Sequence, residues 1–585
     1  MTNKKSLLIL LVIICVFSFF NILKIFLLSD NNFSEVIIPR IISDDYFYYA
    51  RIKEIKDGYP FLGNPFYFEH RLDTNTTFFL PDFFAVLPYL LNFSFFCSFS
   101  INLFVWSLIT ALILYYLFYA MHFTPKICLI GSIFVSMSTI ELFFRPTILQ
   151  VVYPFFILGL IILYHWLQEK ISNKLFFITS LLFTFGLYFY QHLAIILYFL
   201  GGTMAIYFLF IKKVKKFIQL STSILISLIL AIPLLVHYYL LAKNNIFNEL
   251  LLRIDEVFTH VPSFFVFMSG KWVIIAIVIW FFIFKLSENN KEEKKISSFF
   301  IFLGIASILA AASNIFTGVR VEIAEHIYRF QKIYISITVF LLLVYILKYW
   351  RKYLQVNKWL FYFTILFLLI LLVTYSSIGF HSFNSIRVSS LDIKRFQDYK
   401  NIITELNKLP NESVILANEE LSVLIPVYTK HYDLFARDGN AYLISNNEIM
   451  ERYLLSHIFD DSHHDFQLDI GLIIGYGREY DHHKEHNRWV GFCNRCNLNF
   501  FNIDCGKQKS NLDELEPNFF LDMEERYIDT KNNHVEYLNK YNVKYLLIDT
   551  KEDIQWKNFD FQQYPFELIY FDGRFKLYNF IINYN

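Results

Sequence analysis

The sequence predicts a polytopic α-helical membrane protein with about eleven transmembrane helices and a C-terminal extracytoplasmic α/β domain. In composition, 56% of the 585 residues are hydrophobic and 18% are charged, whereas soluble domains average about 45–50% apolar and about 25% charged residues. Long apolar stretches also end near residue 376. Finally, residues 1–375 hold 30 basic and 19 acidic side chains, while residues 376–585 hold 22 and 32, so the net charge of +1 hides two regions of opposite sign.

Transmembrane helices are predicted wherever about 20 consecutive residues are mainly apolar, because such a helix spans the roughly 30 Å of membrane hydrocarbon. Stretch 6–28 is too long for a cleaved signal peptide and lacks a small-residue cleavage site, so we expect an anchor. Stretch 80–96 is apolar but contains Pro81, Asp82 and Pro88, and we expect one helix lying on the outer membrane surface. The eleven predicted spans are 6–28, 101–121, 127–144, 147–167, 175–190, 192–211, 217–240, 272–286, 297–317, 333–349 and 359–376.

The orientation follows from lysine and arginine, which are concentrated in alternate short loops. Because cytoplasmic loops carry excess positive charge, these groups predict a cytoplasmic N-terminus. We therefore expect a multi-pass protein of the plasma (inner) membrane, with a transmembrane domain over 1–376, its first outer loop over 29–100, and an extracytoplasmic domain over 377–585. The basic groups are Lys4-Lys5, Lys126, Lys170 with Lys174, Lys212–Lys216, Lys291–Lys295 and Lys348–Lys358.

After residue 376 the hydrophobic period changes. Residues 394–409 and 533–541 have helical patterns, and 413–417 and 543–548 have the apolar runs of buried strands. Asp572-Gly573 separates two further strands, 566–570 and 575–580, as a hairpin turn. Alternating helices and strands predict an α/β domain. Nothing forms a basic stripe, which argues against a nucleic-acid partner.

The first outer loop contains the sequence Ser-Asp-Asp-Tyr-Phe-Tyr-Tyr-Ala-Arg-Ile at 43–52. We expect a helix that starts at Asp44 and Asp45 and ends at a glycine, Gly58. One interpretation of the acidic pair is a helix cap, because carboxylates accept the first backbone N–H groups. The functional interpretation is that paired carboxylates take a proton or bind a divalent cation such as Mg²⁺ or Mn²⁺. Aromatic side chains such as Tyr48 pack on sugars or lipid, and Arg51 suits a phosphate.

This helix in the first outer loop, with Gly58 and the Tyr67-Phe68-Glu69-His70 stretch, resembles the GT-C membrane glycosyltransferases. The superfamily includes oligosaccharyltransferase catalytic subunits, protein O-mannosyltransferases and the aminoarabinose transferase of lipid A. The resemblance covers most of the chain as a plan, and stretches 80–96 and 537–548 look like the family's juxtamembrane helix and a helix–strand unit of its bacterial soluble domains. The sequon-reading W-W-D-Y-G signature of oligosaccharyltransferases is absent, which argues against Asn-glycosylation.

The resemblance implies transfer of a sugar at the outer membrane face, with inversion at the anomeric carbon. The donor would be a sugar on a polyprenyl phosphate or diphosphate, and the acceptor a hydroxyl or amide of a lipid, a glycan or a protein. By position, Asp44 or Asp45 would activate the acceptor or help hold a metal. The motif does not choose between the two aspartates, or between metal-dependent and metal-free transfer.

Glu141 and Arg145 are expected where the third span emerges outside. Four residues apart on a helix, they form a local ion pair in the simplest interpretation, which is worth a few tenths of a kcal/mol. Ionisable groups at membrane depth are also functional candidates, and GT-C relatives often have an acidic residue in this second outer loop. Both interpretations stay open, with Glu141 as a catalytic and Arg145 as a substrate-binding candidate.

A second charged cluster precedes the span 333–349. Helical spacing places its four members on one face. They form a solvated outer turn in one interpretation and a donor-phosphate site in the other, with Arg329 on the phosphate and an acidic residue near the acceptor or metal. The candidate substrate-binding residues of this cluster are Glu322, Glu325, His326 and Arg329.

Cys493, Cys496 and Cys505 lie in the predicted outer domain, where Cys493 and Cys496 have the C-x2-C spacing of zinc ligands. Outside the cytoplasm a disulfide with one free thiol is the commoner outcome. We therefore expect a disulfide and keep zinc as the alternative.

Two other functions compete with a transferase. A transporter places its binding groups near the bilayer midplane in two related halves, but the mid-span positions here are nearly free of charge and no half-repeat is found. A membrane scaffold whose outer domain binds a partner would explain 377–585, but not the acidic pair in an aromatic helix. The transferase is therefore the favoured hypothesis.

Overall fold

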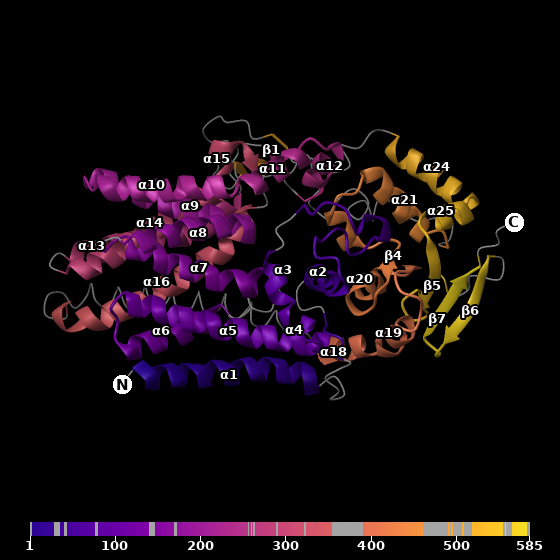
Figure 1. The fold of residues 1–585 in the computed structure, drawn as a ribbon, viewed down its shortest axis with the longest axis horizontal. Helices are drawn as coiled ribbons and strands as arrows, with labels where there is room; N and C mark the ends of the chain where they lie inside the picture. Colours follow the sequence, from indigo (N-terminus) through magenta and orange to yellow (C-terminus); the bar gives the residue numbers. More distant parts are fainter. Residues whose placement is uncertain are drawn as a thin grey trace.

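The computed structural model shows a long helical bundle joined to a smaller α/β unit (Figure 1). It describes residues 3–27, 36–39, 44–76, 80–139, 147–168, 172–254, 257–258, 260, 264–287, 290–320, 323–353, 390–459, 489–491, 493–494, 506–507, 518–553, 556 and 564–581. We call the end of the bundle nearer the α/β unit the domain-facing end.

Long helices lie side by side in the bundle (Figure 1). Four are long and apolar enough to cross a membrane: α5, α9, α14 and residues 326–346 of α16. α10 (Val214–Leu230) and α11 (Ile232–Leu241) would form a fifth span, bent by 52° at Pro233, because proline kinks helices. Together with α10 and α11, the helices of the bundle are α1 (Asn3–Leu27), α5 (Phe95–Ala120), α6 (Pro125–Ser138), α7 (Ile148–His165), α8 (Asn173–Phe189), α9 (Gln191–Phe210), α13 (Phe264–Leu286), α14 (Lys291–Ala311) and α16 (Ile323–Tyr353).

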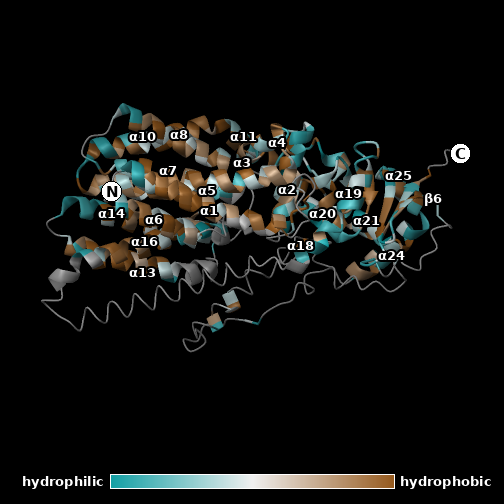
Figure 2. Ribbon diagram, turned by 90° about the horizontal axis from the view of Figure 1, so that it is seen from below, coloured by the Kyte–Doolittle hydropathy of each residue, from teal (hydrophilic) through white to brown (hydrophobic). Residues whose placement is uncertain are grey.

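These helices coincide with the predicted stretches from 6–28 through 333–349. Stretch 359–376 lies outside the described residues, so the total of eleven spans stays a prediction. Large apolar side chains face outward from the bundle: Ile229, Phe281 and Phe282 expose 54%, 52% and 62% of their surface. Hydrophobic residues dominate the bundle, while hydrophilic ones are more frequent in the α/β unit (Figure 2). Exposed apolar surface of this extent is typical of membrane contact. Several of these helices also have the length and apolar composition of transmembrane helices, as expected of an integral membrane protein.

The first outer loop forms α2 (Asp45–Asp57) and the short helix η1 (Phe68–His70). α2 ends at Gly58, whose φ of 106° is the left-handed conformation expected of a glycine C-cap. The prediction of one helix over 80–96 was wrong. α3 (Leu80–Ala85) and α4 (Leu87–Leu90) are separate short helices, and α5 already begins at Phe95. Pro88 lies in the first turn of α4, where its ring prevents the helix from continuing unbroken from α3.

The α/β unit contains a mixed sheet with the strand order β4-β3-β5-β7-β6. β3 (Val414–Leu416) is parallel to β4 (Tyr432–Asp433) and β5 (Val543–Asp549), whereas β7 (Phe575–Phe580) is antiparallel to β5 and to β6 (Phe566–Phe571). The predicted strands and the hairpin are confirmed. The helix predicted over 394–409 is instead two helices. The helical segments of the unit are α18 (Ser390–Gln397), α19 (Lys400–Leu406), α20 (Glu419–Tyr428), η3 (Arg437–Ala441), α21 (Asn446–Ser456), α24 (Phe519–Asn532) and α25 (His534–Lys540).

The first outer loop is packed into the α/β unit. The Tyr67 hydroxyl donates a hydrogen bond of 2.8 Å to the Ala436 carbonyl, and the Arg452 guanidinium lies 4.5 Å from the centre of the Tyr67 ring. A Cβ on Gly439 would lie 2.6 Å from that ring, so the close approach requires glycine. The loop and the α/β unit therefore share one buried core, although they are far apart in the sequence.

A second segment, between α11 and α13, docks on the same unit through α12 (Asn245–Arg253). The Arg253 side chain is fully buried and donates to the carbonyls of Tyr442 and Ile444 at 3.2 and 2.7 Å. Beyond α12, β1 (Val257–Phe258) pairs with β2 (Val319–Arg320), and α15 (Asn314–Thr317) precedes β2. These contacts connect the α/β unit to the segment just before α16.

An ion-pair network joins the first outer loop to α21. His70 contacts Asp73 and Glu448 at 2.6 and 3.0 Å. Burial by itself lowers the pKa of His70, but the hydrogen bonds and charges of those two carboxylates outweigh it and raise the pKa to about 9. Burial raises the pKa of Glu448, but the hydrogen bond from His70 and the charge of Arg452 lower it to about 2.

We predict that His70→Gln destabilises the protein in a pH-dependent way. Because the pKa of His70 is higher in the folded state, its charged contacts stabilise fully below about pH 6.5, and this contribution is lost as the pH rises through 9. The raised pKa corresponds to at most about 3 kcal/mol. Thermal unfolding should show a lower melting temperature for the variant at pH 6 and little difference near pH 9.5. A pH-independent difference would contradict the assignment of the charge.

Candidate active site

Asp44 and Asp45 lie at the start of α2, and α2 lies between the bundle and the α/β unit (Figure 1). Asp44 is half-buried at the N-cap position but makes no capping hydrogen bond through its side chain. Asp45 is fully buried. The side-chain hydrogen bond that the helix-cap interpretation of Asp44 requires is therefore not formed.

The two aspartates face different parts of the structure. Seven residues make nearly two turns of an α-helix, so Asp44 shares a face of α2 with Tyr48 and Arg51. Asp45 shares a face with Tyr49, four residues later. Burial raises the pKa of the Tyr49 hydroxyl, and the charge of Asp45 raises it further. The Tyr49 ring meets Phe95 at the start of α5, with 5.2 Å between ring centres. Asp44 is thus the less buried of the two residues, and Asp45 points into packed side chains.

Arg51 and Asp82 form a buried ion pair between α2 and α3. Arg51 Nη2 lies 2.7 Å from Asp82 Oδ2, and the two side chains expose only 1% and 2% of their surface. Burial raises the pKa of Asp82 more than the charge of Arg51 lowers it. Burial also lowers the pKa of Arg51, but Asp82 outweighs this effect and raises it. Arg51 was predicted to hold a substrate phosphate; the structure gives it a carboxylate partner, and direct substrate contact stays a prediction, as it does for the buried Tyr48.

The helix α3 joins α2 to the membrane bundle. α3 packs on α2, α7 and α8. The Asn102 side chain of α5 donates a hydrogen bond of 2.6 Å to the Ala85 carbonyl, and the Phe84 ring lies 5.4 Å from the ring of Phe189. Because Phe84 follows Asp82 by two residues and Phe189 precedes Tyr190, α3 connects the acidic helix with the start of α9.

A cluster of polar rings lies at the start of α9 and α16. The Tyr190 hydroxyl and His326 Nδ1 are 2.5 Å apart, and Arg329 Nη1 lies 3.2 Å from the same nitrogen. The His192 ring stacks on the His326 ring with 4.7 Å between centres. Since Arg329 has only donors and donates to Nδ1, this nitrogen is an acceptor and the proton of a neutral His326 lies on Nε2. The guanidinium and an imidazole N–H are both groups that bind anions.

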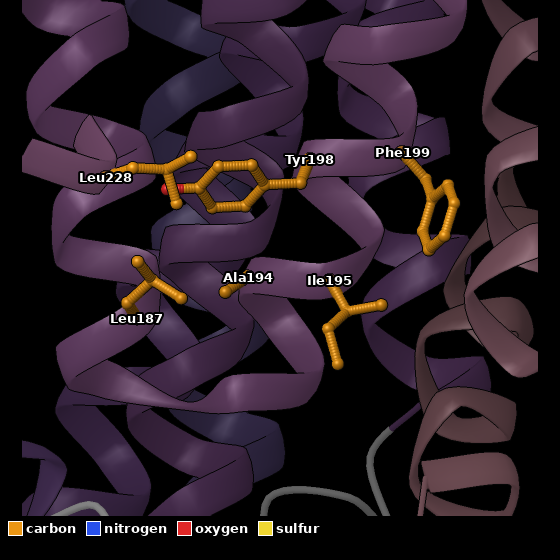
Figure 3. Close-up of a pocket in the computed structure, with 6 residues that line it drawn as sticks. All are labelled: Leu187, Ala194, Ile195, Tyr198, Phe199 and Leu228. Carbon is orange, nitrogen blue, oxygen red and sulfur yellow. The ribbon is translucent and has the colours of Figure 1, made fainter. Parts of the chain in front are cut away.

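An apolar groove lies on the same helix, α9. It has a volume of about 340 Å³ and is lined by side chains of α8, α9 and α10. In Figure 3 the Tyr198 ring lies across the groove with its hydroxyl toward Leu228, and that hydroxyl is 2.7 Å from Ser227 Oγ. Ile195 lines the groove three residues after His192, about 4.5 Å along the helix axis. The other lining residues are Leu187, Ala194 and Phe199.

Several predicted residues cannot be placed in this site. Glu141, Arg145 and Glu322 lie outside the described residues, and Glu325 belongs to α16 although its side chain is not described. His326 and Arg329 are brought together as predicted from their spacing. Asp44 and Asp45 provide two carboxylates, and within the described residues no group of three His, Cys, Asp or Glu side chains could hold a metal ion. Among the candidates that the structure describes, the two aspartates are therefore the carboxylates available to a divalent cation, and metal dependence stays a prediction.

Zinc binding was the alternative prediction for Cys493, and it is wrong for this residue, because Cys493 is disulfide-bonded. A disulfide sulfur is not the thiolate that zinc requires. Cys496 and Cys505 lie outside the described residues.

Comparisons with known proteins give no family assignment. No family model and no curated protein matches the chain. Among solved structures, the chain is similar to the crystal structure of ArnT from Cupriavidus metallidurans in the apo state, with a TM-score of 0.44 and 10% sequence identity over 99% of both chains. A likeness at this level does not determine the function of this chain.

Three site residues were missed from the sequence. Tyr190 and His192 were placed at the boundary between two predicted spans, and Asp82 was used only as an argument against a span. A signal was present for the first two: polar residues interrupt a long apolar run at 190–192. For Asp82 the signal was a carboxylate in an otherwise apolar stretch, which needs a buried partner.

We predict that breaking the Arg51–Asp82 pair destabilises the protein. Arg51→Met or Asp82→Asn should each cost about 3–5 kcal/mol, because one charged or polar partner is left buried. The double variant Arg51→Met/Asp82→Leu should lose less than the sum of the two. Thermal unfolding in detergent measures this coupling. The exposed pair Arg526–Asp522 provides the control, since Arg526→Met should have little effect; equal effects at both pairs would contradict the structural role.

Proposed function

We propose that this protein is a membrane glycosyltransferase that uses a lipid-phosphate-linked sugar as donor. The observation that carries the proposal is the combination of an anion-binding cluster on α16, which contacts the start of α9, and an apolar groove lined by the same α9. His326 and Arg329 suit a phosphate headgroup, and the groove beside Ile195 suits a hydrocarbon tail. A polyprenyl-phosphate-linked sugar has both parts. The resemblance of the α2 sequence to GT-C enzymes supports the same class of donor.

The proposed reaction takes place at the domain-facing end of the bundle. An ionised carboxylate accepts the proton of an acceptor hydroxyl, the hydroxyl oxygen forms a bond to the anomeric carbon, and the bond from that carbon to the phosphate oxygen breaks. The lipid phosphate leaves with the bonding electrons, and the sugar is inverted. We assign the base role to Asp44, because it is half-buried and lies on the face of α2 that carries Arg51. A base must reach the acceptor, and full burial makes Asp45 less suited to that role.

The cluster on α16 would stabilise the leaving phosphate. Donors that are already oriented toward developing negative charge lower the barrier without reorganising at the moment of reaction. His326 is held by Tyr190 and Arg329, so its imidazole has a defined orientation. Glu141 and Glu325 stay in the proposal as acidic candidates near the acceptor, and Arg145 and Glu322 as substrate-binding candidates.

The remaining parts of the proposal concern partners and location. The acceptor would be a lipid, a glycan or a protein, and the surrounding lipid that of the plasma (inner) membrane, with the N-terminus cytoplasmic and the α/β unit extracytoplasmic. Mg²⁺ or Mn²⁺ is an optional partner of Asp44 and Asp45. Two carboxylates alone are a weak site for cations that bind six or more oxygen ligands. Transfer measured with and without EDTA tests this part.

We predict that Asp44→Asn lowers the turnover number at least about 100-fold, which is the usual contribution of a general base, without lowering the melting temperature. Asp45→Asn should change the melting temperature as well, because its carboxyl is buried in packed side chains. Consumption of lipid-linked sugar by purified protein measures the rate. Glu567→Gln, at an exposed glutamate, is the control; unchanged transfer in both aspartate variants would contradict the catalytic assignment.

We predict that Arg329→Met raises the KM for the lipid donor about tenfold or more, since a charge-assisted hydrogen bond contributes about 1.5–3 kcal/mol. Arg329→Lys should recover part of the affinity because it restores the charge. Initial rates over a range of donor concentrations provide the measurement.

A matched variant tests the groove. Ile195→Trp should obstruct it and impair transfer from a long-chain donor while leaving transfer from a donor with a short isoprenoid chain. Equal impairment with both chain lengths would rule out a role of the groove in holding the tail.

A further inference from the structure

A small polar cavity lies between the C-terminal end of α2 and the α/β unit. Its volume is about 80 Å³, and it is bounded by α2, the loop after α2 and the segments before β3 and β4. Such a volume holds a few water molecules. Glu54 lines it, together with Tyr432 of β4. The cavity thus marks the place where the helix that begins at Asp45 meets the α/β unit.

Glu54 is buried in this contact, with 5% of its surface exposed. Among the described residues its side chain has one hydrogen bond, a long one of 3.5 Å from the Tyr432 hydroxyl. On α2 itself, the neighbouring Asp57 accepts a hydrogen bond from Lys53. An ionised carboxylate in this position would therefore be poorly solvated.

The other charged groups around the cavity do not compensate Glu54. Glu412 is bound to Arg71 at 2.7 Å and to the Tyr59 hydroxyl at 2.5 Å. Both ring nitrogens of His431 are engaged: Nδ1 accepts from the Ser413 N–H at 3.3 Å and Nε2 donates to the Leu406 carbonyl at 2.8 Å. His431 is therefore a neutral imidazole, and burial lowers its pKa.

Lys430 also lines the cavity, but its side chain is exposed to solvent. Burial raises the pKa of Glu54 to about 8, and the charge of Asp57 adds to this effect against the opposing charges of Lys53 and Arg71. At neutral pH the carboxyl is accordingly mostly protonated. The pKa of Glu54 in the folded protein exceeds its ordinary value of 4.5. The Glu54 carboxyl therefore lowers the free energy of unfolding progressively from pH 4.5 to 8, and this loss of stability is complete above pH 8. A glutamine of the same shape would avoid this loss.

We propose that Glu54 is a proton-dependent positioning residue for α2. With its proton, the carboxyl is tolerated in the buried contact with β4, and α2 is seated on the α/β unit. When the proton leaves, the carboxylate draws water into the cavity and loosens the C-terminal end of α2. The seating of the helix that carries the candidate base at its other end thus depends on pH. This inference goes beyond the transfer reaction and does not depend on it.

Hydrogen–deuterium exchange of the full-length protein in detergent tests the proposal. Labelling times are scaled so that chemical exchange is equal at pH 6.5 and pH 9. Peptides from 45–57 and 411–432 should exchange at least about threefold faster at pH 9 in the wild type. In Glu54→Gln the same peptides should show no such increase, because the glutamine cannot ionise.

Two further measurements keep the test decisive. Glu567→Gln, at an exposed glutamate on β6, should behave as the wild type. The melting temperature of Glu54→Gln should exceed that of the wild type by about 2 °C or more at pH 8.5 and equal it near pH 5. The proposal is overturned if the pH-dependent increase in exchange is absent from the wild type or persists in Glu54→Gln. Loss of transfer in Asp44→Asn has no bearing on this result, so failure of the proposed function is separately detectable.

Discussion

The burial of α2 between the bundle and the α/β unit is the constraint on which the candidate site depends. A helix enclosed in this way has to find a partner for every charged side chain, because an unpaired charge in a low-dielectric interior is costly. Arg51 meets this requirement through Asp82 at 2.7 Å, and Lys53 through Asp57. The Arg51–Asp82 pair joins α2 to α3 and so fixes how α2 is turned, whereas the Lys53–Asp57 pair lies within α2.

The same constraint explains why elements distant in the sequence come together. α2 packs on α20, the loop after it donates and accepts hydrogen bonds with residues beyond 430, and Arg253 attaches α12 to the carbonyls of that same region. The α/β unit therefore acts as a support for two outer segments of the bundle. This arrangement suits the proposed reaction, because the helix with the candidate base is held from both sides.

Composition and hydrophobic period predicted most of the fold. The apolar stretches from 6–28 to 333–349 became helices, Gly58 ended α2, and the strands 543–548 and 575–580 paired in the sheet, because each of these features is set by local propensity and by water exclusion. The stretch 80–96 was wrong as one helix, since the proline at 88 divides it, and the contact of Asp82 with Arg51 was not predicted. Local pattern does not report such a tertiary contact.

For the site, the sequence by itself determined the residue types and their order: the acidic pair before an aromatic helix, and the His326–Arg329 spacing on α16. Only the tertiary structure decided that Asp44 is half-buried while Asp45 is fully buried, that Arg51 pairs with Asp82, and that Tyr190 and His192 join His326. The physical reason is the distance along the sequence over which each effect acts. Helical spacing acts over three or four residues, whereas burial and charge pairing depend on which distant segments are packed together.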